Sequence, residues 1–304
     1  MNIRDLQYLV AVHDMNNFSK AAERCYVSQP TLSGQLKKLE EELNAPLIER
    51  STRQVLFTAL GEQVVEMARE ILLTADNIRA AAKSSQDPFA GEFHIGLIPT
   101  IGPFLLPSLM PILGREFPNA QIYLYELPTR ELTQKLIKGE LDAVILAKLD
   151  TNASFYEVPL YQENMKLAVC EQDELAKCET AVGLHVLEER SVLMLEDGHC
   201  LRDQALSVCK SAGAHEDTRF KATSMDTLLH MVANGSGMTL VPELASNKAT
   251  EGVRYLNFVE PQPSREIIML MRKQSARKPA LEVFANRITD LINPNQTETQ
   301  EHAA

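Results

Sequence analysis

Hydrophobic residues follow two patterns along this chain, and the change comes near residue 90. Before it, apolar residues recur every three or four positions, as they do on one face of a helix. The predicted helices of this part cover 2–13, 18–25, 28–43 and 58–83. A polar segment over 84–91, which contains Pro88 and Gly91, is the best predicted domain boundary.

After residue 90, short apolar runs alternate with longer amphipathic stretches. The predicted strands are 93–98, 121–126, 142–147, 166–170, 191–196, 219–224, 237–242 and 266–271. The predicted helices are 104–117, 129–138, 201–212, 225–234 and 279–292. Alternation of this kind indicates a parallel α/β architecture. The last residues, 294–304, are polar and are expected to be disordered.

The second and third predicted helices have the pattern of a helix-turn-helix. Ser28 is suited to cap the third helix, and the face made by Leu32, Leu36, Leu39 and Leu43 predicts a buried side. The uncharged polar positions outside that face are Gln29, Pro30, Thr31, Ser33 and Gln35. Short polar side chains at the start of such a helix suit base edges in a major groove. An ordinary amphipathic hairpin is the alternative.

The net charge of −11 argues at first against a nucleic-acid partner. Residues 1–58, however, hold seven basic and seven acidic residues, so the excess of acid lies in the rest of the chain. The candidate cations for DNA phosphates are Lys20, Lys37, Arg50 and Arg53, the last two within a predicted hairpin wing over 47–57. Each is equally compatible with an ordinary solvated surface charge.

The long helix over 58–83 has an apolar face longer than one small domain requires. Its members are Val64, Met67, Ala68, Ile71, Leu72, Ala75 and Ile78. A face of this length favours a linker helix that pairs with a second copy of the chain. The length of 304 residues is sufficient for two or three domains, each with its own core.

The string AAERCYVSQPTLSGQLKKLEEELNAPLIERSTRQVLFTALG resembles the N-terminal signature of the LysR-type transcriptional regulators. The resemblance implies an α/β protein with a winged helix-turn-helix domain over 1–58 and a dimerising linker helix and hinge over 59–90. It also implies a regulatory domain similar to periplasmic binding proteins, with lobe I over 91–162 and 268–293 and lobe II over 163–267. The chain is expected to cross between the lobes near 161–164 and 263–267. A ligand site is expected between them, at the carboxyl ends of the strands.

Five cysteines in a chain without a secretory leader are expected to be reduced thiols. Cys25, Cys170 and Cys178 are interpreted as packing residues. Cys200 differs, because it stands where a strand passes into a helix, with His199 and Arg202 beside it. These neighbours and the helix N-terminus favour a thiolate, whereas the acidic residues Glu196 and Asp203 oppose it.

The segment GHCLRDQ, with a second cysteine nine positions after the first, resembles the peroxide-sensing members of the same family. The resemblance implies that Cys200 is the peroxidatic thiol, that Cys209 is the resolving thiol, and that antioxidant genes are controlled. It assigns the peroxide pocket to Thr100, Thr129, His199 and Arg265. For Thr129 a helix cap is an alternative. For Arg265 the alternative is an exposed charge at a strand end.

A helix between the two cysteines predicts a switch. Nine residues of helix separate two α-carbons by ~13 Å, whereas a disulfide requires roughly 4.4–6.8 Å. The segment must therefore unwind when the bridge forms. Two other classes stay open: a regulator that binds a small organic effector between the lobes, and a thiol peroxidase. The seven histidines are scattered, so the sequence predicts no metal site.

The expected partners follow from these assignments. They are double-stranded DNA half-sites, hydrogen peroxide, further copies of the chain in a dimer or tetramer, RNA polymerase and a cellular dithiol reductant. No cofactor is expected. No apolar run approaches the ~18 residues of a membrane span, so we expect a cytoplasmic protein.

Overall fold

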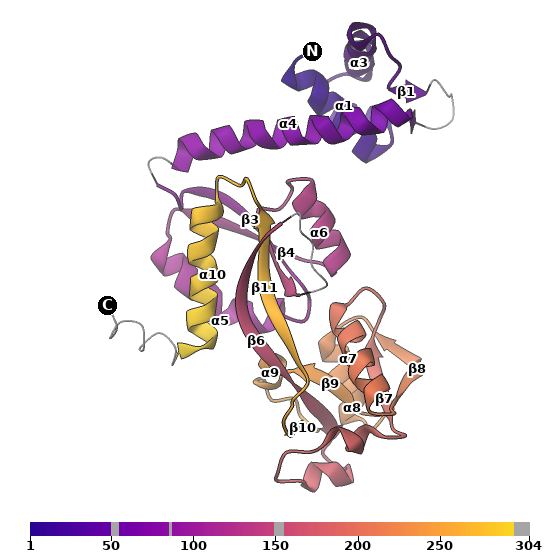
Figure 1. Cartoon of the computed structure of the whole chain (residues 1–304), viewed down its shortest axis with the longest axis vertical. Helices are drawn as coiled ribbons and strands as arrows, with labels where there is room; N and C mark the ends of the chain where they lie inside the picture. Colours follow the sequence, from indigo (N-terminus) through magenta and orange to yellow (C-terminus); the bar gives the residue numbers. More distant parts are fainter. Residues whose placement is uncertain (50–54, 85–86, 149–154, 295–304) are drawn as a thin grey trace. The chain divides into compact units, whose positions relative to one another are not determined.

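The computed structural model describes residues 1–49, 55–84, 87–148 and 155–294, which belong to two compact units, 1–82 and 83–304. Figure 1 traces their helices and strands. Within the described ranges, no helix is both long enough and apolar enough to cross a bilayer. The predicted DNA contacts Arg50 and Arg53 and nearly all of the predicted tail lie outside the described residues.

The N-terminal unit confirms the four predicted helices to within two residues at each end. Its elements are α1 (Ile3–Met15), α2 (Phe18–Arg24), α3 (Gln29–Leu43), β1 (Ile48–Glu49), β2 (Leu56–Phe57) and α4 (Ala59–Ser84). The short strands β1 and β2 pair antiparallel within the predicted wing.

The ends of these helices are set by polar side chains. Asn2 forms a capping box with Asp5 at the start of α1, and Ser28 accepts a hydrogen bond from the backbone N–H of Thr31 at 3.3 Å. The predicted cap of α3 is thereby confirmed. Asn44 ends α3 in the left-handed conformation, with φ 51°. Leu43, predicted to be buried, is 39% exposed, because α3 ends there.

The second unit is built on a mixed sheet. Its strands are β3 (Gly91–Leu97), β4 (Ala120–Glu126), β5 (Ala143–Ala147), β6 (Phe155–Cys170), β7 (Ser191–Leu195), β8 (His215–Ala222), β9 (Thr239–Pro242), β10 (Val253–Asn257) and β11 (Ser264–Arg272). Its helices are α5 (Gly102–Glu116), α6 (Thr129–Ile137), η1 (Glu174–Lys177), η2 (Leu184–Leu187), α7 (Cys200–Ser211), α8 (Met225–Ala233), α9 (Glu243–Ser246) and α10 (Lys278–Ile292).

The expectation of a parallel architecture was only partly right. The main sheet has the order β10-β6-β11-β5-β3-β4, and β9 also pairs with β6. Strand β3 is parallel to β4 and β5, and β7 is parallel to β8, but every pair that includes β6 or β11 is antiparallel. The reason is that β6 and β11 run through both lobes and return past each other.

The sequence predicted only 166–170 of strand β6, which spans sixteen residues. Proline lacks the N–H donor that a strand ladder uses, so Pro159 is not expected within a long strand. The structure accommodates Pro159 at a bulge: Ile268 faces Pro159 and Ile267 faces Tyr161, so Leu160 has no partner in β11. Strands β6 and β11 run side by side in Figure 1, and their pairing extends from Ser264 and Asn164 to Arg272 and Phe155.

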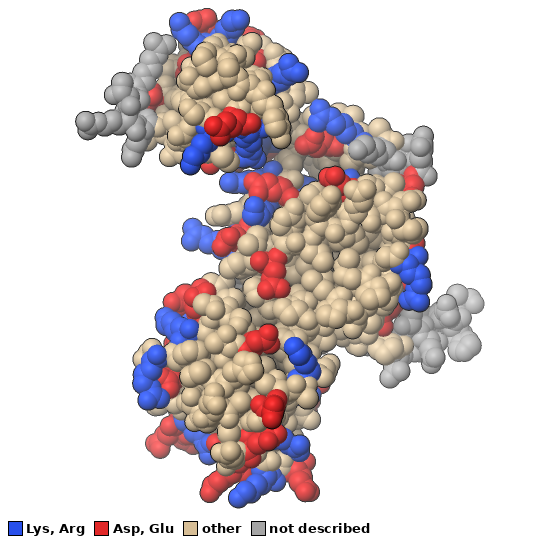
Figure 2. Space-filling view, turned by 180° about the vertical axis from the view of Figure 1, so that it is seen from behind, with Lys and Arg blue, Asp and Glu red and all other residues tan. Residues whose placement is uncertain are grey.

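Separate hydrophobic cores support the two lobes. The core of lobe I lies between the sheet and the helices α5, α6 and α10, and its largest buried members include Phe93 and Phe284. Lobe II contains two smaller clusters, one around Met225 and Leu228 and the other around Leu167 and Phe258. On the face drawn in Figure 2, acidic and basic side chains are interspersed in the lower part of the view, whereas a broad area in the middle shows few charged side chains.

Candidate functional site

Cys200 and Cys209 lie on the same helix of lobe II. The turn before α7 contains Gly198, whose φ of +100° favours glycine, and His199 is the extended N-cap residue. Cys200 is the first residue of α7, and Cys209 comes two and a half turns later. The helix predicted between the two cysteines is confirmed.

The two thiols are buried in different cores. Cys200 is 4% exposed and joins the core of lobe I, whereas Cys209 is 1% exposed and packs in the cluster around Leu167 and Phe258. This placement follows from helix geometry, because residues nine apart at ~3.6 per turn point to opposite sides of a helix. All five cysteines are free thiols in this structure.

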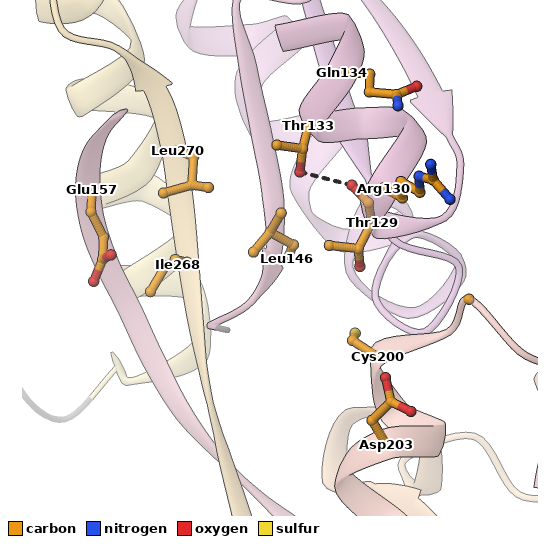
Figure 3. Close-up of a pocket in the computed structure, with 11 residues that line it drawn as sticks. Thr129, Arg130, Thr133, Gln134, Leu146, Glu157, Cys200, Asp203, Ile268 and Leu270 are labelled. Carbon is orange, nitrogen blue, oxygen red and sulfur yellow. Dashed lines mark hydrogen bonds between the residues drawn. The ribbon is translucent and has the colours of Figure 1, made fainter. Parts of the chain in front are cut away.

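A cavity of about 430 Å³ opens beside Cys200, between the two lobes. Its apolar wall comes from the sheet of lobe I and consists of Leu146, Ile268 and Leu270. Figure 3 shows Cys200 at one side of this space and Thr129 opposite. The volume of this cavity lies within the ~300–1,000 Å³ that small-molecule sites occupy, so it is the candidate ligand site.

Thr129 is the first residue of α6 and is 8% exposed. Its hydroxyl has no hydrogen-bond partner among the described residues, and in Figure 3 its side chain lies on the side of α6 that faces Cys200. The alternative assignment of Thr129 as a helix cap is therefore wrong. Neither Pro128 before α6 nor His199 before α7 caps its helix with a side-chain hydrogen bond, so the first N–H groups of both helices lack this acceptor within the described part of the chain.

His199 is 6% exposed, and its Nδ1 atom has no hydrogen-bond partner among the residues described. Burial lowers the pKa of His199, against a smaller opposing effect of the Glu196 carboxylate. The imidazole is therefore neutral at neutral pH, and it contributes hydrogen-bonding atoms to the neighbourhood of Cys200 rather than a cation.

Arg202 does not act as the free cation that its position in the sequence indicated. Its Nε donates to Asp197 at 2.9 Å, and its two terminal nitrogens donate to the carboxylate of Glu216 at 2.7 and 3.2 Å. Asp197 also accepts a hydrogen bond from Lys221 at 3.0 Å. The charge of Arg202 is thus used to tie the start of α7 to β8.

Arg265 is also buried, at 3% exposure, so the alternative of an exposed strand-end charge is wrong. It donates to Thr100 Oγ1 at 2.9 Å and to Glu163 Oε2 at 2.8 Å. The residues predicted for the peroxide pocket therefore fall into two groups. Thr129 lines the cavity with Cys200, and His199 precedes the thiol, whereas Arg265 donates hydrogen bonds to both Thr100 and Glu163.

Burial raises the pKa of the Cys209 thiol to about 11, and the nearby Glu216 carboxylate acts in the same direction. Cys209 is therefore protonated at neutral pH while α7 is folded. Among the described residues, no group of three or more His, Cys, Asp or Glu side chains is arranged to hold a metal ion.

The predicted DNA-reading residues lie at the start of α3. Gln29, Pro30 and Thr31 are exposed, Ser33 and Gln35 are half-buried, and Lys20 and Lys37 are exposed. Lys37 also forms an ion pair with Glu41 at 3.7 Å. The sequence analysis did not select Tyr26, which is 96% exposed in the turn before α3 with φ 55°. An exposed tyrosine beside a polar helix start is suited to a phosphate contact.

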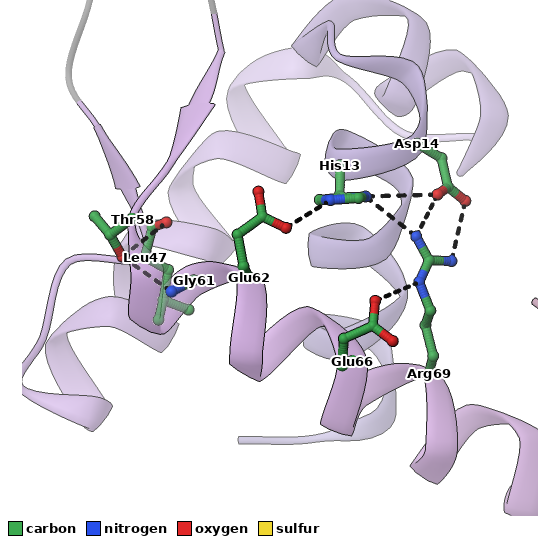
Figure 4. Close-up of polar contacts among 8 residues, drawn as sticks. All are labelled: His13, Asp14, Leu47, Thr58, Gly61, Glu62, Glu66 and Arg69. Atoms are coloured by element: carbon green, nitrogen blue, oxygen red, sulfur yellow. Dashed lines mark hydrogen bonds and ion pairs between the residues drawn. The ribbon is translucent and has the colours of Figure 1, made fainter.

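A buried ion pair joins α1 to α4 within the N-terminal unit, as Figure 4 shows. Arg69 of α4 donates to Asp14, and its Nη2 lies 3.1 Å from Nδ1 of His13. His13 Nε2 in turn lies 3.0 Å from a carboxylate oxygen of Glu62. This contact fixes α4 to α1, and periodicity alone did not predict it.

Two family models match the chain. Residues 3–62 match the bacterial regulatory helix-turn-helix of the lysR family, and residues 86–292 match the LysR substrate binding domain. A relative named hydrogen peroxide-inducible genes activator, from Dickeya chrysanthemi, is 47% identical over 292 residues, which cover 95% of each chain.

Solved structures agree with these matches. A full-length OxyR variant from Pseudomonas aeruginosa has a TM-score of 0.78 and 35% identity, covering 95% of this chain and 94% of that one. The oxidized form of OxyR has a TM-score of 0.62 and 45% identity, and covers 68% of this chain and 98% of that one.

Proposed function

Because the chain belongs to the LysR family of bacterial transcriptional regulators, we propose that it is a DNA-binding activator that senses hydrogen peroxide through Cys200. A relative similar over nearly the whole chain is named for peroxide-inducible genes. The observation that carries the proposal is the placement of Cys200. Cys200 starts a helix, and its thiol lines a cavity whose opposite side holds the Thr129 hydroxyl, which has no hydrogen-bond partner among the described residues.

In the first step the Cys200 thiolate attacks one oxygen of the peroxide. An S–O bond forms, the O–O bond breaks, and the departing hydroxide takes up a proton and leaves as water, so that Cys200 becomes a sulfenic acid. The hydroxyl of Thr129 and the first N–H groups of α6 and α7 are the donors suited to stabilise the departing oxygen. Neutral His199 is suited to hold the peroxide by a hydrogen bond.

In the second step Cys209 attacks the oxidised sulfur. The S–O bond breaks, a disulfide forms, and the oxygen leaves as a second molecule of water. The fold described here does not permit this attack, because the two thiols lie on opposite faces of α7, ~13 Å apart along the axis. Helix α7 must therefore unwind and give up the ion pair between Arg202 and Glu216.

We propose that this refolding of lobe II changes how copies of the chain are paired, and so how α3 is presented to operator half-sites. Hydrogen bonds from Arg265 to Glu163 and Thr100 connect the crossing strands to the start of α5. These contacts are suited to transmit a conformational change in lobe II to lobe I. A cellular dithiol resets the switch by thiol–disulfide exchange, and RNA polymerase is the partner expected of an activator.

Mass-spectrometric mapping of thiols tests the proposal directly. One equivalent of hydrogen peroxide, applied briefly to the reduced full-length protein, is expected to consume Cys200 and Cys209 and to spare Cys25, Cys170 and Cys178. Operator binding should then change in the same sample and return after treatment with a dithiol. A change in DNA binding upon adding an organic effector, with all five thiols intact, would favour an effector-binding regulator instead.

A further inference from the structure

A second cavity of about 490 Å³ lies in the regulatory unit, apart from the one beside Cys200. Its walls come from α5 and the C-terminal end of α10 in lobe I, from α9 in lobe II, and from β6 where it crosses between the lobes. The two cavities share no lining residue. The volume lies within the ~300–1,000 Å³ that small-molecule sites occupy.

The polar group that marks this cavity is the phenol of Tyr161. The side chain lines the cavity and is 6% exposed, and its hydroxyl has no hydrogen-bond partner among the described residues. A buried hydroxyl without a partner is unfavourable by roughly 1–3 kcal/mol. A ligand that forms a hydrogen bond with this hydroxyl would remove that cost. Tyr161 also follows the bulge at Leu160, and bulges commonly redirect side chains next to functional sites.

The charges on the wall are compensated. Glu163, 3% exposed, is 2.7 Å from Arg265 and accepts the N–H of Leu244 at 3.1 Å. Glu243 is 3.4 Å from Lys166. Because both carboxylates that line the cavity already have cations, the site favours an uncharged molecule over an anion or a cation. Burial also raises the pKa of Tyr161, so its hydroxyl stays neutral.

The remaining lining has an apolar part, made by Phe104, Leu105, Leu244, Leu291 and Ile292, and an uncharged polar part, made by Ser108, Gln162, Asn247 and Asn293. We propose that this cavity binds an uncharged aromatic alcohol, a phenol, whose hydroxyl pairs with Tyr161 and whose ring packs on the apolar wall. A hydroxyl suits Tyr161 because each partner can either donate or accept. The bound molecule contacts both lobes and the strand between them, so it stabilises the reduced arrangement and slows disulfide formation.

Calorimetric titration of the reduced full-length protein with 2-naphthol tests the binding. We expect 2-naphthol to bind at least tenfold more tightly than the 2-naphthoate anion. Tyr161→Phe should weaken the binding of 2-naphthol five- to tenfold, because it removes the hydroxyl and keeps the ring. Ser108→Trp, which fills the cavity from α5, should abolish binding. Ser236→Trp, at an exposed loop position outside the cavity, is the matched control and should leave the affinity unchanged.

The rate of disulfide formation after one equivalent of peroxide is the second readout. Saturating 2-naphthol should slow disulfide formation severalfold in the unchanged protein and should leave the rate of the Ser108→Trp variant unchanged. The proposal is overturned if 2-naphthol gives no binding heat, if both cavity substitutions leave its affinity unchanged, or if the rate does not respond. The calorimetric result does not depend on peroxide sensing, so it separates a failure of this site from a failure of Cys200 as the sensor.

Discussion

Arg202 in the first turn of α7 donates two hydrogen bonds to the carboxylate of Glu216 in β8, at 2.7 and 3.2 Å. Both side chains are largely buried, with 10% and 18% exposure. Hydrogen bonds between charged groups contribute ~1.5–3 kcal/mol, so this pair helps to keep α7 helical in the reduced protein. In the proposed switch, this pair breaks before Cys209 reaches Cys200.

Glu216→Gln should therefore accelerate formation of the Cys200–Cys209 disulfide by about tenfold. The substitution keeps the shape of the side chain and removes the charge that holds Arg202, and it also relieves the effect of Glu216 on the raised pKa of Cys209. Rapid quenching followed by non-reducing electrophoresis measures the rate. Glu251→Gln, at an exposed position, is the control. An unchanged rate in Glu216→Gln would show that α7 is not restrained by this pair.

Cys200→Ser should abolish the response to peroxide, whereas Cys209→Ser should lose the disulfide and retain a sulfenic acid at Cys200. The difference is expected because only Cys200 lines the cavity, while Cys209 is buried on the other side of α7. A sulfenic-acid probe and non-reducing gels distinguish the products. A peroxide-dependent mobility shift that persists in Cys200→Ser would contradict the assignment.

Local periodicity was sufficient for the longer helices of this fold, but it predicted neither the four-residue helices η1, η2 and α9 nor the pairing between strands. Strand β6 was recognised only at its end, because Pro159 is a poor strand residue unless a bulge accommodates it. Strand β10 was missed altogether, and the antiparallel return of β11 beside β6 was not predicted from the alternation of strands and helices. These features depend on neighbours far away in the chain.

The site shows the same limit. The position of Cys200 at the start of a helix follows from the sequence, since Gly198 and His199 precede an amphipathic stretch. The partners of the two nearby arginines could not be predicted from the sequence. Arg265 pairs with Glu163 across 102 positions, and Arg202 pairs with Glu216 across 14. Only the folded chain shows that the charge of Arg202 is paired with Asp197 and Glu216.

Arg69→Met should loosen α1 from α4. Breaking a buried ion pair costs about 3–5 kcal/mol when a charge is left uncompensated. Here the cost is smaller, because Asp14, whose side chain is 7% exposed, keeps the half-exposed Arg24 at 3.5 Å. Hydrogen exchange of the α1 amides, followed by mass spectrometry, should accelerate at least tenfold. Arg79→Met is the matched control on the same helix, since Arg79 is 63% exposed. Equal exchange in both variants would contradict the role of this contact.

The stability of the reduced protein should fall as the pH drops below about 6.5, the ordinary pKa of histidine, and His199 should account for part of the loss. Burial lowers its pKa in the fold, so the unfolded chain takes up a proton first. The contribution of neutral His199 to the folding stability is fully present above pH 6.5. It is lost as the pH falls through the lower pKa that His199 has in the folded state. His199→Gln should flatten the dependence of the melting temperature between pH 7.5 and 5.5. An unaltered slope would place the effect in other groups.

Thr129→Val should lower the rate at which peroxide oxidises Cys200 by about ten- to a hundredfold, if its hydroxyl stabilises the departing oxygen. Valine has nearly the same shape, so the fold is expected to persist. Thr133→Val is the comparison within the same cavity, because the Thr133 hydroxyl already donates to the backbone carbonyl of Thr129 at 2.8 Å. Its rate should change less than threefold. Stopped-flow measurements with each variant in the Cys209→Ser background isolate the first step, and equal rates for the two would remove Thr129 from the reaction.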